Sequence, residues 1–386
     1  MKWETVRLGD IIDFSNGINF DKSAYTQGIK IVGVSDFGNL FSPNYDELSE
    51  VKSDIVKSKD LLKNGDIVFV RSNGNKELVG RCMLVKKLPY PVTYSGFCIR
   101  ARINNPNSYN SVFLTYYFKS MFFRKLLSGS SVGANIQNLS QARLSNCTIS
   151  IPHIQTQKRI ADILSAYDDL IENNQRQIKL LEEAAQRLYK EWFVDLRFPG
   201  HEHTAIVDGV PEGWTYSEID SVFSIRYGKT LPTSKISSTG KYPVYGANGI
   251  IGYYDEKNCD DYSVLITSRG NGSGDVLRTY DKESFITNNS FIVKALNENI
   301  GFSYTHQLMV HTDFKNIRTG SAQPQLTNNS ISTLKIFIPS NTLIDHYCLS
   351  TDAIYKKIIV LLKQIRLATQ ARDRLLPKLM SGEMEV

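Results

Sequence analysis

The sequence predicts an α+β protein in which two mixed α/β domains are separated by a pair of long antiparallel coiled-coil helices, with a pseudo-two-fold internal repeat. Two observations lead to this fold class. A central stretch and a C-terminal stretch both carry apolar residues in steps of three and four, the pattern of a helix that packs along its whole length on one partner. The two stretches also match position by position, because 351 − 164 and 379 − 192 both equal 187. The chain therefore contains a duplicated long helix, and each copy follows a larger domain.

The composition is that of an ordinary folded protein. The 386 residues, 41% hydrophobic and 22% charged, are enough for two or more domains with separate cores. The longest apolar runs are far shorter than the ~20 residues of a membrane span, and the N-terminus lacks a signal-peptide core. The five scattered cysteines include no Cys-x-x-Cys pair, which favours neither a disulfide framework nor a zinc site. We therefore expect a cytoplasmic protein with no membrane partner and no metal.

The charge is mildly positive and unevenly distributed. The formal net charge is +6. Residues 60–105 carry eight Lys or Arg against three Asp or Glu, and residues 226–241 carry four Lys or Arg and no acid. Basic clusters of this kind attract polyanions such as nucleic acid, but they also occur as plain solvated surface. Charge alone therefore leaves both interpretations open.

Residues 1–152 are predicted to form the first domain. It opens with a short strand and helix from Trp3, and an aromatic-rich stretch at 112–127 favours a buried helix over a binding surface. A final strand ends at Pro152. The internal strand segments, which are rich in Val, Ile, Phe and Tyr, are 29–34, 67–70, 82–85 and 97–103.

Residues 153–198 are predicted to form the central long helix. Thr156 or a neighbouring residue is expected to cap its N-terminus. One position of the apolar seam is polar, Asn174, and a polar seam residue often fixes the register of a coiled coil. The seam consists of Leu164, Tyr167, Ile171, Asn174, Ile178, Leu181, Ala185, Leu188 and Trp192.

Residues 199–339 are predicted to form a linker and the second domain, and residues 340–386 a C-terminal helix that pairs with the central one. The stretch at 197–213 is rich in Pro and Gly, as linkers are. Trp214 then opens the second domain as Trp3 opens the first. The seam of the C-terminal helix consists of Thr351, Ile354, Ile358, Leu361, Ile365, Ala368, Arg372, Leu375 and Leu379.

The repeat is constant in the helices and variable in the domains. The offset of 187 holds from Gly133 and Gly320 to the ends of the helices, whereas Trp3 and Trp214 are 211 apart. The 24-residue difference therefore lies inside the domains, as expected of a two-fold scaffold that carries two different recognition domains. The central helix has six basic and seven acidic residues between 158 and 193, and the C-terminal helix has seven basic and three acidic between 345 and 380. These imbalances favour pairing of the two helices with each other.

The sequence contains no complete catalytic constellation. The glycines at 270, 272 and 274 lack the Gly-Lys-Ser/Thr of a phosphate loop and the full dinucleotide fingerprint. Residues 288–291 have only the ends of the Asn-Pro-Pro-Phe/Tyr motif of amino-methyltransferases. Glu50-Val51-Lys52 lacks the Pro-Asp that precedes a nuclease carboxylate–lysine site. His201-Glu202-His203 lies in the linker with no third metal ligand nearby. We therefore expect no catalytic residue and no metal in this chain.

Several motifs resemble the specificity (S) subunit of type I restriction-modification systems. They are residues 242–254, Gly-Val-Pro-Glu-Gly-Trp214, residues 149–152 followed by Gln157-Lys-Arg-Ile-Ala161, and Arg374-Leu-Leu-Pro-Lys-Leu-Met-Ser-Gly-Glu383. The last is close to a signature of that family, and the likeness covers nearly the whole chain. Two departures concern the helix starts. Thr156 stands where the family usually has an acid, and the second helix begins with residues 342–346 instead of the entry motif.

The resemblance implies that each domain is a target-recognition domain for one half of a split site in double-stranded DNA. It also implies that two modification (methyltransferase) subunits, which bind S-adenosylmethionine, dock on the chain, and that restriction subunits can join the complex. A helix of about 52 Å spans at most ~15 base pairs, so the half-sites should lie about one helical turn apart. The target adenines would be flipped into the partner's pocket, not into this chain.

Specificity is then expected from Arg, Asn and Gln side chains on loops. For each candidate, a phosphate contact or plain surface is an equal alternative to base recognition. The candidates in the first domain are Arg71, Ser72, Asn73, Asn75, Lys76, Arg81, Asn135 and Gln137, and those in the second are Tyr227, Lys229, Tyr245, Asn248, Arg269, Asn271, Ser273 and Gln323.

Two other function classes stay open at this point. The chain could be a self-sufficient DNA methyltransferase or nuclease, which turnover by the purified chain alone would reveal. It could also be a coiled-coil scaffold with no role in DNA binding, which predicts no salt-dependent affinity for DNA even in an assembled complex. The unequal domains, rich in Arg and Asn, argue against the scaffold hypothesis.

Overall fold

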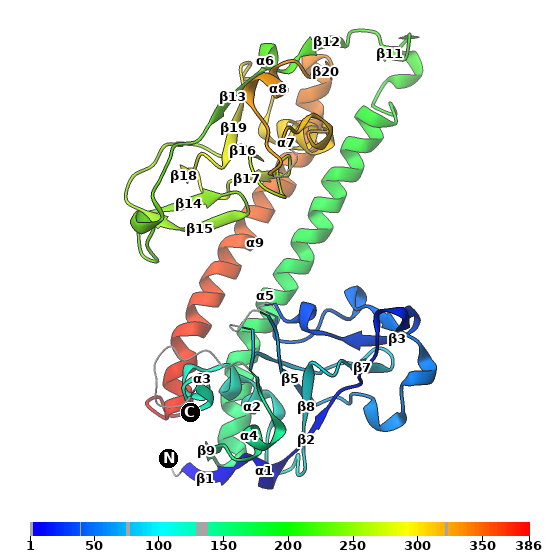
Figure 1. The fold of residues 1–386 in the computed structure, drawn as a ribbon. Helices are drawn as coiled ribbons and strands as arrows, with labels where there is room; N and C mark the ends of the chain where they lie inside the picture. Colours follow the sequence, from blue (N-terminus) through cyan, green and yellow to red (C-terminus); the bar gives the residue numbers. More distant parts are fainter. Residues whose placement is uncertain (1–2, 39, 75–77, 129–137, 321–322) are drawn as a thin grey trace. The chain divides into compact units, whose positions relative to one another are not determined.

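The computed structural model describes residues 3–38, 40–74, 78–128, 138–320 and 323–386. The chain divides into two compact units, residues 1–172 with 365–386, and residues 173–364. Each unit holds one mixed α/β domain together with part of each long helix (Figure 1). The predicted α+β class is confirmed, although the units divide the chain within the long helices instead of at their ends.

The domain of the first unit is built on three small sheets. Strands β2, β8, β5 and β6 lie in that order in a four-stranded sheet, β4, β3 and β7 form a three-stranded sheet, and β1 pairs with β9. Among the described strands of this domain, only the β3–β7 pair is parallel. The elements are β1 Trp3–Arg7, α1 Leu8–Ile11, β2 Ile12–Asn16, β3 Tyr25–Val32, β4 Glu50–Val51, β5 Ile67–Val70, β6 Cys82–Leu84, β7 Val92–Tyr94, β8 Cys98–Ile103, α2 Ser111–Lys119, α3 Met121–Ser128, α4 Gln141–Ser145 and β9 Thr148–Pro152.

The domain of the second unit repeats this topology. Strands β13, β19, β16 and β17 form its four-stranded sheet, β15, β14 and β18 its three-stranded sheet, and β12 pairs with β20. Here too one pair, β14–β18, is parallel. The elements are β10 Ile206–Val207, β11 Val210–Pro211, β12 Thr215–Glu218, α6 Ile219–Val222, β13 Phe223–Tyr227, β14 Tyr242–Gly246, β15 Gly249–Tyr254, β16 Val264–Thr267, β17 Val276–Arg278, β18 Phe285–Ile286, β19 Ser290–Ala295, α7 Phe302–His311, α8 Asn328–Ser332 and β20 Lys335–Ile338.

Equivalent hydrogen bonds and strand positions show where the two domains differ in length. The offset between matching residues falls stepwise along the chain, so the 24-residue difference is spread over three stretches. The largest step lies between the first sheet strand and the central strand. The matching pairs are Gly17 and Gly228 (offset 211), Arg71 and Ser268 (197), Phe97 and Asn289 (192), and Leu139 and Leu326 (187).

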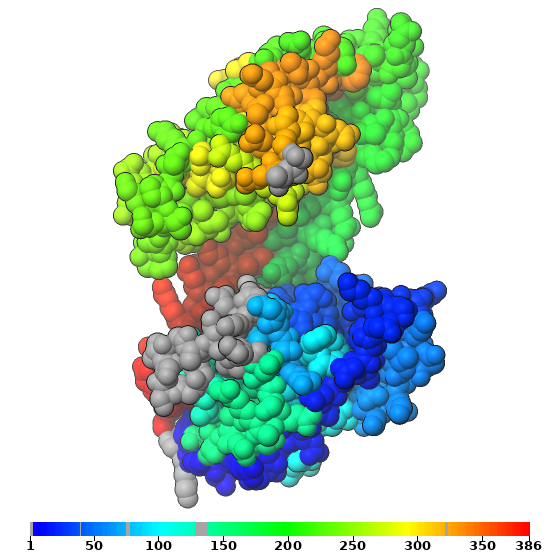
Figure 2. Space-filling model, in the orientation of Figure 1, coloured from blue at the N-terminus to red at the C-terminus, as the bar shows by residue number. Residues whose placement is uncertain are grey.

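The central strand of each domain is buried on both faces. In β5, Ile67 and Phe69 face a core that also contains α2 and residues of both long helices, whereas Val68 and Val70 face a second core under β3 and β7. In β16, the same alternation separates Val264 and Ile266 from Leu265. A strand covered on both faces has a continuous apolar sequence, which explains why β5 could be predicted with its correct bounds. Figure 2 shows that stretches far apart in the sequence adjoin on the second unit, where green, yellow and orange atoms touch.

The long helices are α5, Ile154–Tyr189 with 36 residues, and α9, Asn341–Ser381 with 41 residues. In the first unit, the Arg372 guanidinium of α9 donates to the Asp168 carboxylate of α5. In the second unit, Asn174 Nδ2 donates to Gln364 Oε1 at 3.1 Å, and Tyr347 Oη to the Ala185 carbonyl at 3.1 Å. The helices are therefore antiparallel in the second unit. All eighteen predicted seam residues are buried or half-buried, and the role of Asn174 in fixing register stays a prediction.

Three details of the sequence analysis are wrong. Helix α5 begins at Ile154, so Thr156 lies inside its first turn and does not cap it, whereas the neighbouring His153 precedes the helix and its Nδ1 lies 3.5 Å from the Gln155 amide. The aromatic stretch at 112–127 is two helices, α2 and α3, because the Ser120 hydroxyl and amide both bond the Tyr117 carbonyl, at 2.6 and 3.0 Å. Such a local bond competes with the regular helix. The predicted burial is confirmed for most of the stretch, including Phe113, Phe118 and Phe123, whereas Met121 is 69% exposed. The third detail, the start of β8, is described below.

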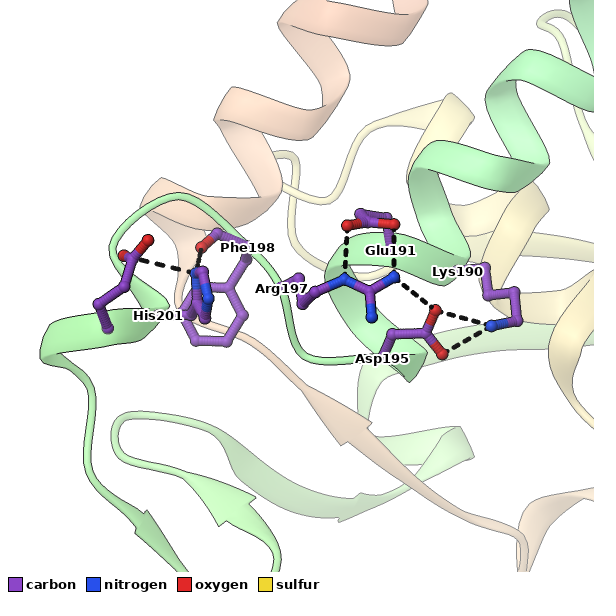
Figure 3. Close-up of polar contacts among 7 residues, drawn as sticks. Lys190, Glu191, Asp195, Arg197, Phe198 and His201 are labelled. Carbon is purple, nitrogen blue, oxygen red and sulfur yellow. Dashed lines mark hydrogen bonds and ion pairs between the residues drawn. The ribbon is translucent and has the colours of Figure 1, made fainter.

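An ion-pair network connects the C-terminal end of α5 to the first residues of the linker (Figure 3). The helix ends in a π-helical turn, Lys190–Val194. Lys190 Nζ lies 2.6 Å from the Asp195 carboxylate, and Arg197 makes two bonds of 2.6 and 2.8 Å to the carboxylate of Glu191. His201 Nδ1 lies 2.8 Å from the Phe198 carbonyl, so this ring is held by the linker backbone.

Candidate nucleic-acid interface

A glycine-rich turn follows the central strand of the second domain. Gly270 and Gly274 have φ of +83° and +88°, which disfavours other residues. The amide of Gly274 donates to the Thr267 carbonyl at 2.8 Å, which closes the turn. Arg269 and Asn271 are exposed on it. The turn therefore holds two candidate DNA-binding side chains on a defined backbone.

Other candidates of the second domain lie on segments that adjoin this turn. The Gly270 amide donates to the Pro324 carbonyl at 3.0 Å, which places the exposed Gln323 beside it. A Cβ on Gly272 would lie 3.7 Å from Asn248 Oδ1. On the other side, the Ser268 amide bonds the Asn289 carbonyl, and the Asn288 amide bonds the carbonyl of the exposed Lys229. We call residues 227–230, 246–249, 268–274, 287–290 and 323–325 the second loop cluster.

Two candidates of the second domain, Tyr245 and Ser273, are buried, and a third, Tyr227, is half-buried. Tyr245 is 1% exposed and its hydroxyl accepts from the Tyr280 amide at 2.9 Å, and burial raises the pKa of its phenol. Ser273 is fully buried and donates to the Ser268 carbonyl. Neither side chain can reach a DNA base, so both predictions are wrong. Tyr227 is half-buried and its hydroxyl bonds the Leu326 carbonyl at 3.2 Å, which makes it part of the fold.

The first domain holds its candidates on the equivalent loops. Arg71, Ser72 and Asn73 follow β5, and all three are half-buried. Arg71 Nη1 donates to the Gly96 carbonyl at 3.2 Å, so part of this guanidinium is used within the loops. Arg81 is half-buried on the strand side of the same loop. The remaining candidates, Asn75, Lys76, Asn135 and Gln137, lie outside the described residues, and their role stays a prediction.

The sequence analysis missed one exposed side chain beside these loops, Phe97. Strand β8 begins at Cys98, and Phe97 lies in the tight turn before it instead of in the strand. Its side chain is 62% exposed and its carbonyl accepts from the Arg71 amide at 2.8 Å. The preceding Ser95-Gly96 pair is a turn signal that could have revealed the strand boundary. The exposed ring adds an apolar group to a surface of Arg, Ser and Asn.

The chemistry of these loops suits DNA. Arg and Lys bind phosphates and guanine edges, and Asn and Gln bind adenine edges. Within the described ranges, no three His, Cys, Asp or Glu side chains gather in a way that could hold a metal ion. No helix in the part of the chain that the structure describes is long and apolar enough to cross a membrane.

Two copies of one sheet-and-loop domain, each with different polar loops and each packed on both long helices, place this chain among proteins built from a duplicated domain on a helical scaffold. The chain belongs to the type I restriction modification DNA specificity family, whose domain model matches residues 1–183 and 211–349. The resemblance that the sequence motifs indicated is therefore confirmed, and the chain is identified as a specificity subunit of a type I restriction-modification system.

Individual relatives agree with this family. The type I restriction enzyme MjaIX specificity subunit of Methanocaldococcus jannaschii is 26% identical over 72% of this chain and 69% of its own length. The MjaX specificity subunit of the same organism, named as putative, is 27% identical over 62% of this chain and 57% of its own length. Among solved structures, the type I restriction-modification S subunit from M. genitalium has a TM-score of 0.61 at 19% identity, covering 98% of this chain and 96% of that one. The last likeness supports the fold.

Proposed function

We propose that this chain recognises a bipartite sequence in double-stranded DNA, with one domain for each half-site, and that it docks two modification subunits. One observation carries the proposal. The two domains share one backbone arrangement, but they place different exposed side chains at equivalent loop positions, such as Phe97 and Asn289. A duplicated scaffold with different loop side chains suits two different sequences of bases.

We further propose that the methyltransferase chemistry, with its S-adenosylmethionine, resides in the modification subunits and not in this chain. The motifs that superficially suggest catalysis are engaged in the fold. Glu50 accepts from the Gly28 amide at 2.8 Å and pairs with Lys30 Nζ at 3.1 Å. Residues 288 and 289 form a tight turn, and the glycines at 270–274 form another. The target adenine would therefore be extruded into the partner's pocket.

The two long helices are proposed to set the gap between the half-sites. Helix α5 has 36 residues, which corresponds to about 54 Å at ~1.5 Å per residue. A gap of at most ~16 base pairs matches that length at ~3.4 Å per base pair. Restriction subunits would add to the complex of this chain with its modification subunits, and we expect the complex in the cytoplasm.

The target is tested by mapping methylated adenines in DNA exposed to the full chain with its modification subunits. The expected result is a split motif, with two specified halves and an unspecified gap of fixed length. A contiguous motif, or methylation without sequence preference, would contradict the proposal. The mass of the complex, measured in solution, tests the expected two modification subunits for each chain.

A substitution with a matched control tests whether the second loop cluster contributes to methylation of the native site. Arg269→Ala should weaken methylation of the native site, because Arg269 is exposed beside Asn271 and Gln323, while assembly with the modification subunits is unchanged. Lys335→Ala on β20, which is exposed outside the second loop cluster, is the control and should leave methylation intact. If both variants lost methylation of the native site to the same extent, Arg269 would not be a specific part of the DNA interface.

The alternative of a self-sufficient enzyme is tested separately. The purified chain alone is incubated with DNA, magnesium and S-adenosylmethionine. Methylation or cleavage without partner subunits would favour a methyltransferase or nuclease over a specificity subunit. A scaffold with no DNA role would instead show no salt-dependent DNA binding in the assembled complex.

A further inference from the structure

One two-residue turn has the same backbone in both domains. In the first it connects β7 to β8, and the Cys98 amide donates to the Ser95 carbonyl at 2.8 Å. In the second it connects β18 to β19, and the Ser290 amide donates to the Thr287 carbonyl at 3.2 Å. The central residues are Gly96 and Phe97 in the first turn, and Asn288 and Asn289 in the second. We call these the β7–β8 turn and the β18–β19 turn.

Both turns are clamped against the end of a neighbouring strand by a glycine. A Cβ on Gly17 would lie 2.2 Å from the Tyr94 carbonyl oxygen and 2.4 Å from that of Ser95. A Cβ on Gly228 would lie 2.3 Å from the Thr287 carbonyl oxygen. These distances are far shorter than any contact that a side chain can make, so only glycine lets the strand end approach the turn this closely.

Both turns are also bonded to the loop after the central strand. In the first domain, the Arg71 amide donates to the Phe97 carbonyl, and Arg71 Nη1 donates to the Gly96 carbonyl. In the second domain, the Ser268 amide donates to the Asn289 carbonyl, and Ser268 Oγ donates to the Asn288 carbonyl at 3.2 Å. Each turn is therefore fixed on two sides, and the second of its central residues is held at the same place in each domain.

The side chains at this fixed place differ in chemistry. Asn is a favoured turn residue, but the backbone does not require Phe, since Phe97 is not among the described residues with positive φ. Phe97 does not serve the core either, because it is 62% exposed. Asn289 is also exposed. The ring is therefore required by neither local geometry nor burial, and it is exposed where it can contact another molecule.

We propose that this turn residue is a specificity-determining position in each half-site, a statement that rests on the proposed DNA-recognition function. Phe97 makes an apolar contact with a thymine methyl group or the face of a base in the half-site of the first domain. Asn289 makes hydrogen bonds to a base edge, with adenine as the matching partner, in the half-site of the second domain. The rigid backbone holds each side chain in position before DNA binds.

The test uses the full chain, assembled with its modification subunits, on a DNA library in which both half-sites are randomised. Sequencing the methylated products gives the base preference at each position. Phe97→Ala should reduce the preference at one position of one half-site by about tenfold and leave the other half-site unchanged. Asn289→Ala should reduce the preference at one position of the other half-site and leave unchanged the half-site that Phe97→Ala affects. Phe97→Asn should install a new preference at the position that Phe97→Ala relaxes.

The control is Tyr216→Ala, which removes an aromatic side chain of similar exposure, 59%, from strand β12 outside the loops. It should leave every preference unchanged. Thermal unfolding of the Phe97 and Asn289 variants is expected to match that of the unsubstituted chain, because both side chains are exposed. Tyr216→Ala removes a ring contact with Phe337 at 4.7 Å and is expected to be slightly less stable. The inference is wrong if the unsubstituted chain selects a split motif but Phe97→Ala and Asn289→Ala leave the base preference at every position unchanged. The proposed function is not contradicted by that result. If the unsubstituted chain selects no sequence, the proposed function itself fails.

Discussion

At the scale of single residues, the second unit contains a buried polar cluster that joins its domain to both long helices. His306 of α7 is 7% exposed, and its Nδ1 lies 2.8 Å from the Tyr355 hydroxyl of α9. Arg278 of β17 lies 3.3 Å from the same ring and pairs with Glu182 of α5. Burial, and next the charge of Arg278, hold the pKa of His306 well below its ordinary value. The imidazole is therefore neutral in the folded chain.

This cluster predicts a loss of stability in mild acid. The unfolded chain binds a proton at His306 once the pH falls below about 6.5, whereas the folded chain does not. The free energy of unfolding should therefore fall with pH below that value, with a slope of up to about 1.4 kcal/mol per pH unit from this group. Urea unfolding at pH 7.5, 6.5 and 5.5 measures it. His306→Gln, which keeps a hydrogen-bonding group for Tyr355, should flatten the slope. A variant with the original slope would show that His306 does not cause the pH dependence.

The two clamping glycines give a second prediction at this scale. Gly17→Ala and Gly228→Ala each force a methyl group to within 2.2 or 2.3 Å of a backbone carbonyl oxygen, so the strand end must move away from its turn. We expect each substitution to lower the free energy of unfolding by about 2 kcal/mol, measured in urea. Gly38→Ala is the control, since a Cβ there meets no atom within 4 Å. If Gly17→Ala were as stable as Gly38→Ala, the turn would not be held rigidly.

At the scale of secondary-structure elements, the long helices and the central strands could be predicted from the sequence, because their patterns depend on burial along a whole element. The apolar steps of three and four revealed α5 and α9, and a continuous apolar run revealed β5. The break at Ser120 could not be predicted, since it depends on one hydroxyl bond to Tyr117. The burial of Tyr245 could not either, because the neighbours that cover it come from distant segments.

The helix pair of the first unit depends on one carboxylate, which gives a third prediction. Asp168 of α5 accepts from the Tyr116 hydroxyl of α2 and from the Arg372 guanidinium of α9. Its side chain is 11% exposed. Asp168→Ala leaves the buried Tyr116 hydroxyl without its acceptor and leaves Arg372 paired with Asp373 alone, so we expect a loss of about 2 kcal/mol in the free energy of unfolding.

Thermal and urea unfolding of the full chain measure this loss. The matched control is Asp169→Ala at the next position, where the carboxylate is 62% exposed and pairs with Lys86 at 3.3 Å. That change should cost no more than ~0.5 kcal/mol. Equal effects of the two substitutions would mean that the Asp168 contacts contribute little to holding the domain on its helices.

At the scale of the whole chain, the repeat separates constant parts from variable ones. The offset between the two copies is 187 in the helices and rises to 211 at the domain openings, so length has changed only inside the domains. The domains fold on the same strand order despite this difference. Which loop residues contact DNA could not be predicted from residue type alone. Ser273 and Asn271 lie two positions apart on one turn, yet the first is buried and the second exposed. Constant helices with variable loops suit a protein whose target bases can change while the spacing between half-sites is kept.

The final prediction tests whether the helices set that spacing. Seven residues with the seam pattern are inserted into both helices at facing positions, after Asn174 in α5 and before Gln364 in α9, which are hydrogen-bonded to each other. One heptad preserves the seam and lengthens each helix by about 10 Å, which equals about three base pairs. Methylation of the native site should collapse, and mapping of methylated adenines should find the same two halves with a gap longer by about three base pairs. An insertion into α5 alone places the two seams out of register, and should lower stability without a new target. If the double insertion still methylated the native site at the original rate, the gap would be set by the modification subunits and not by the helices of this chain.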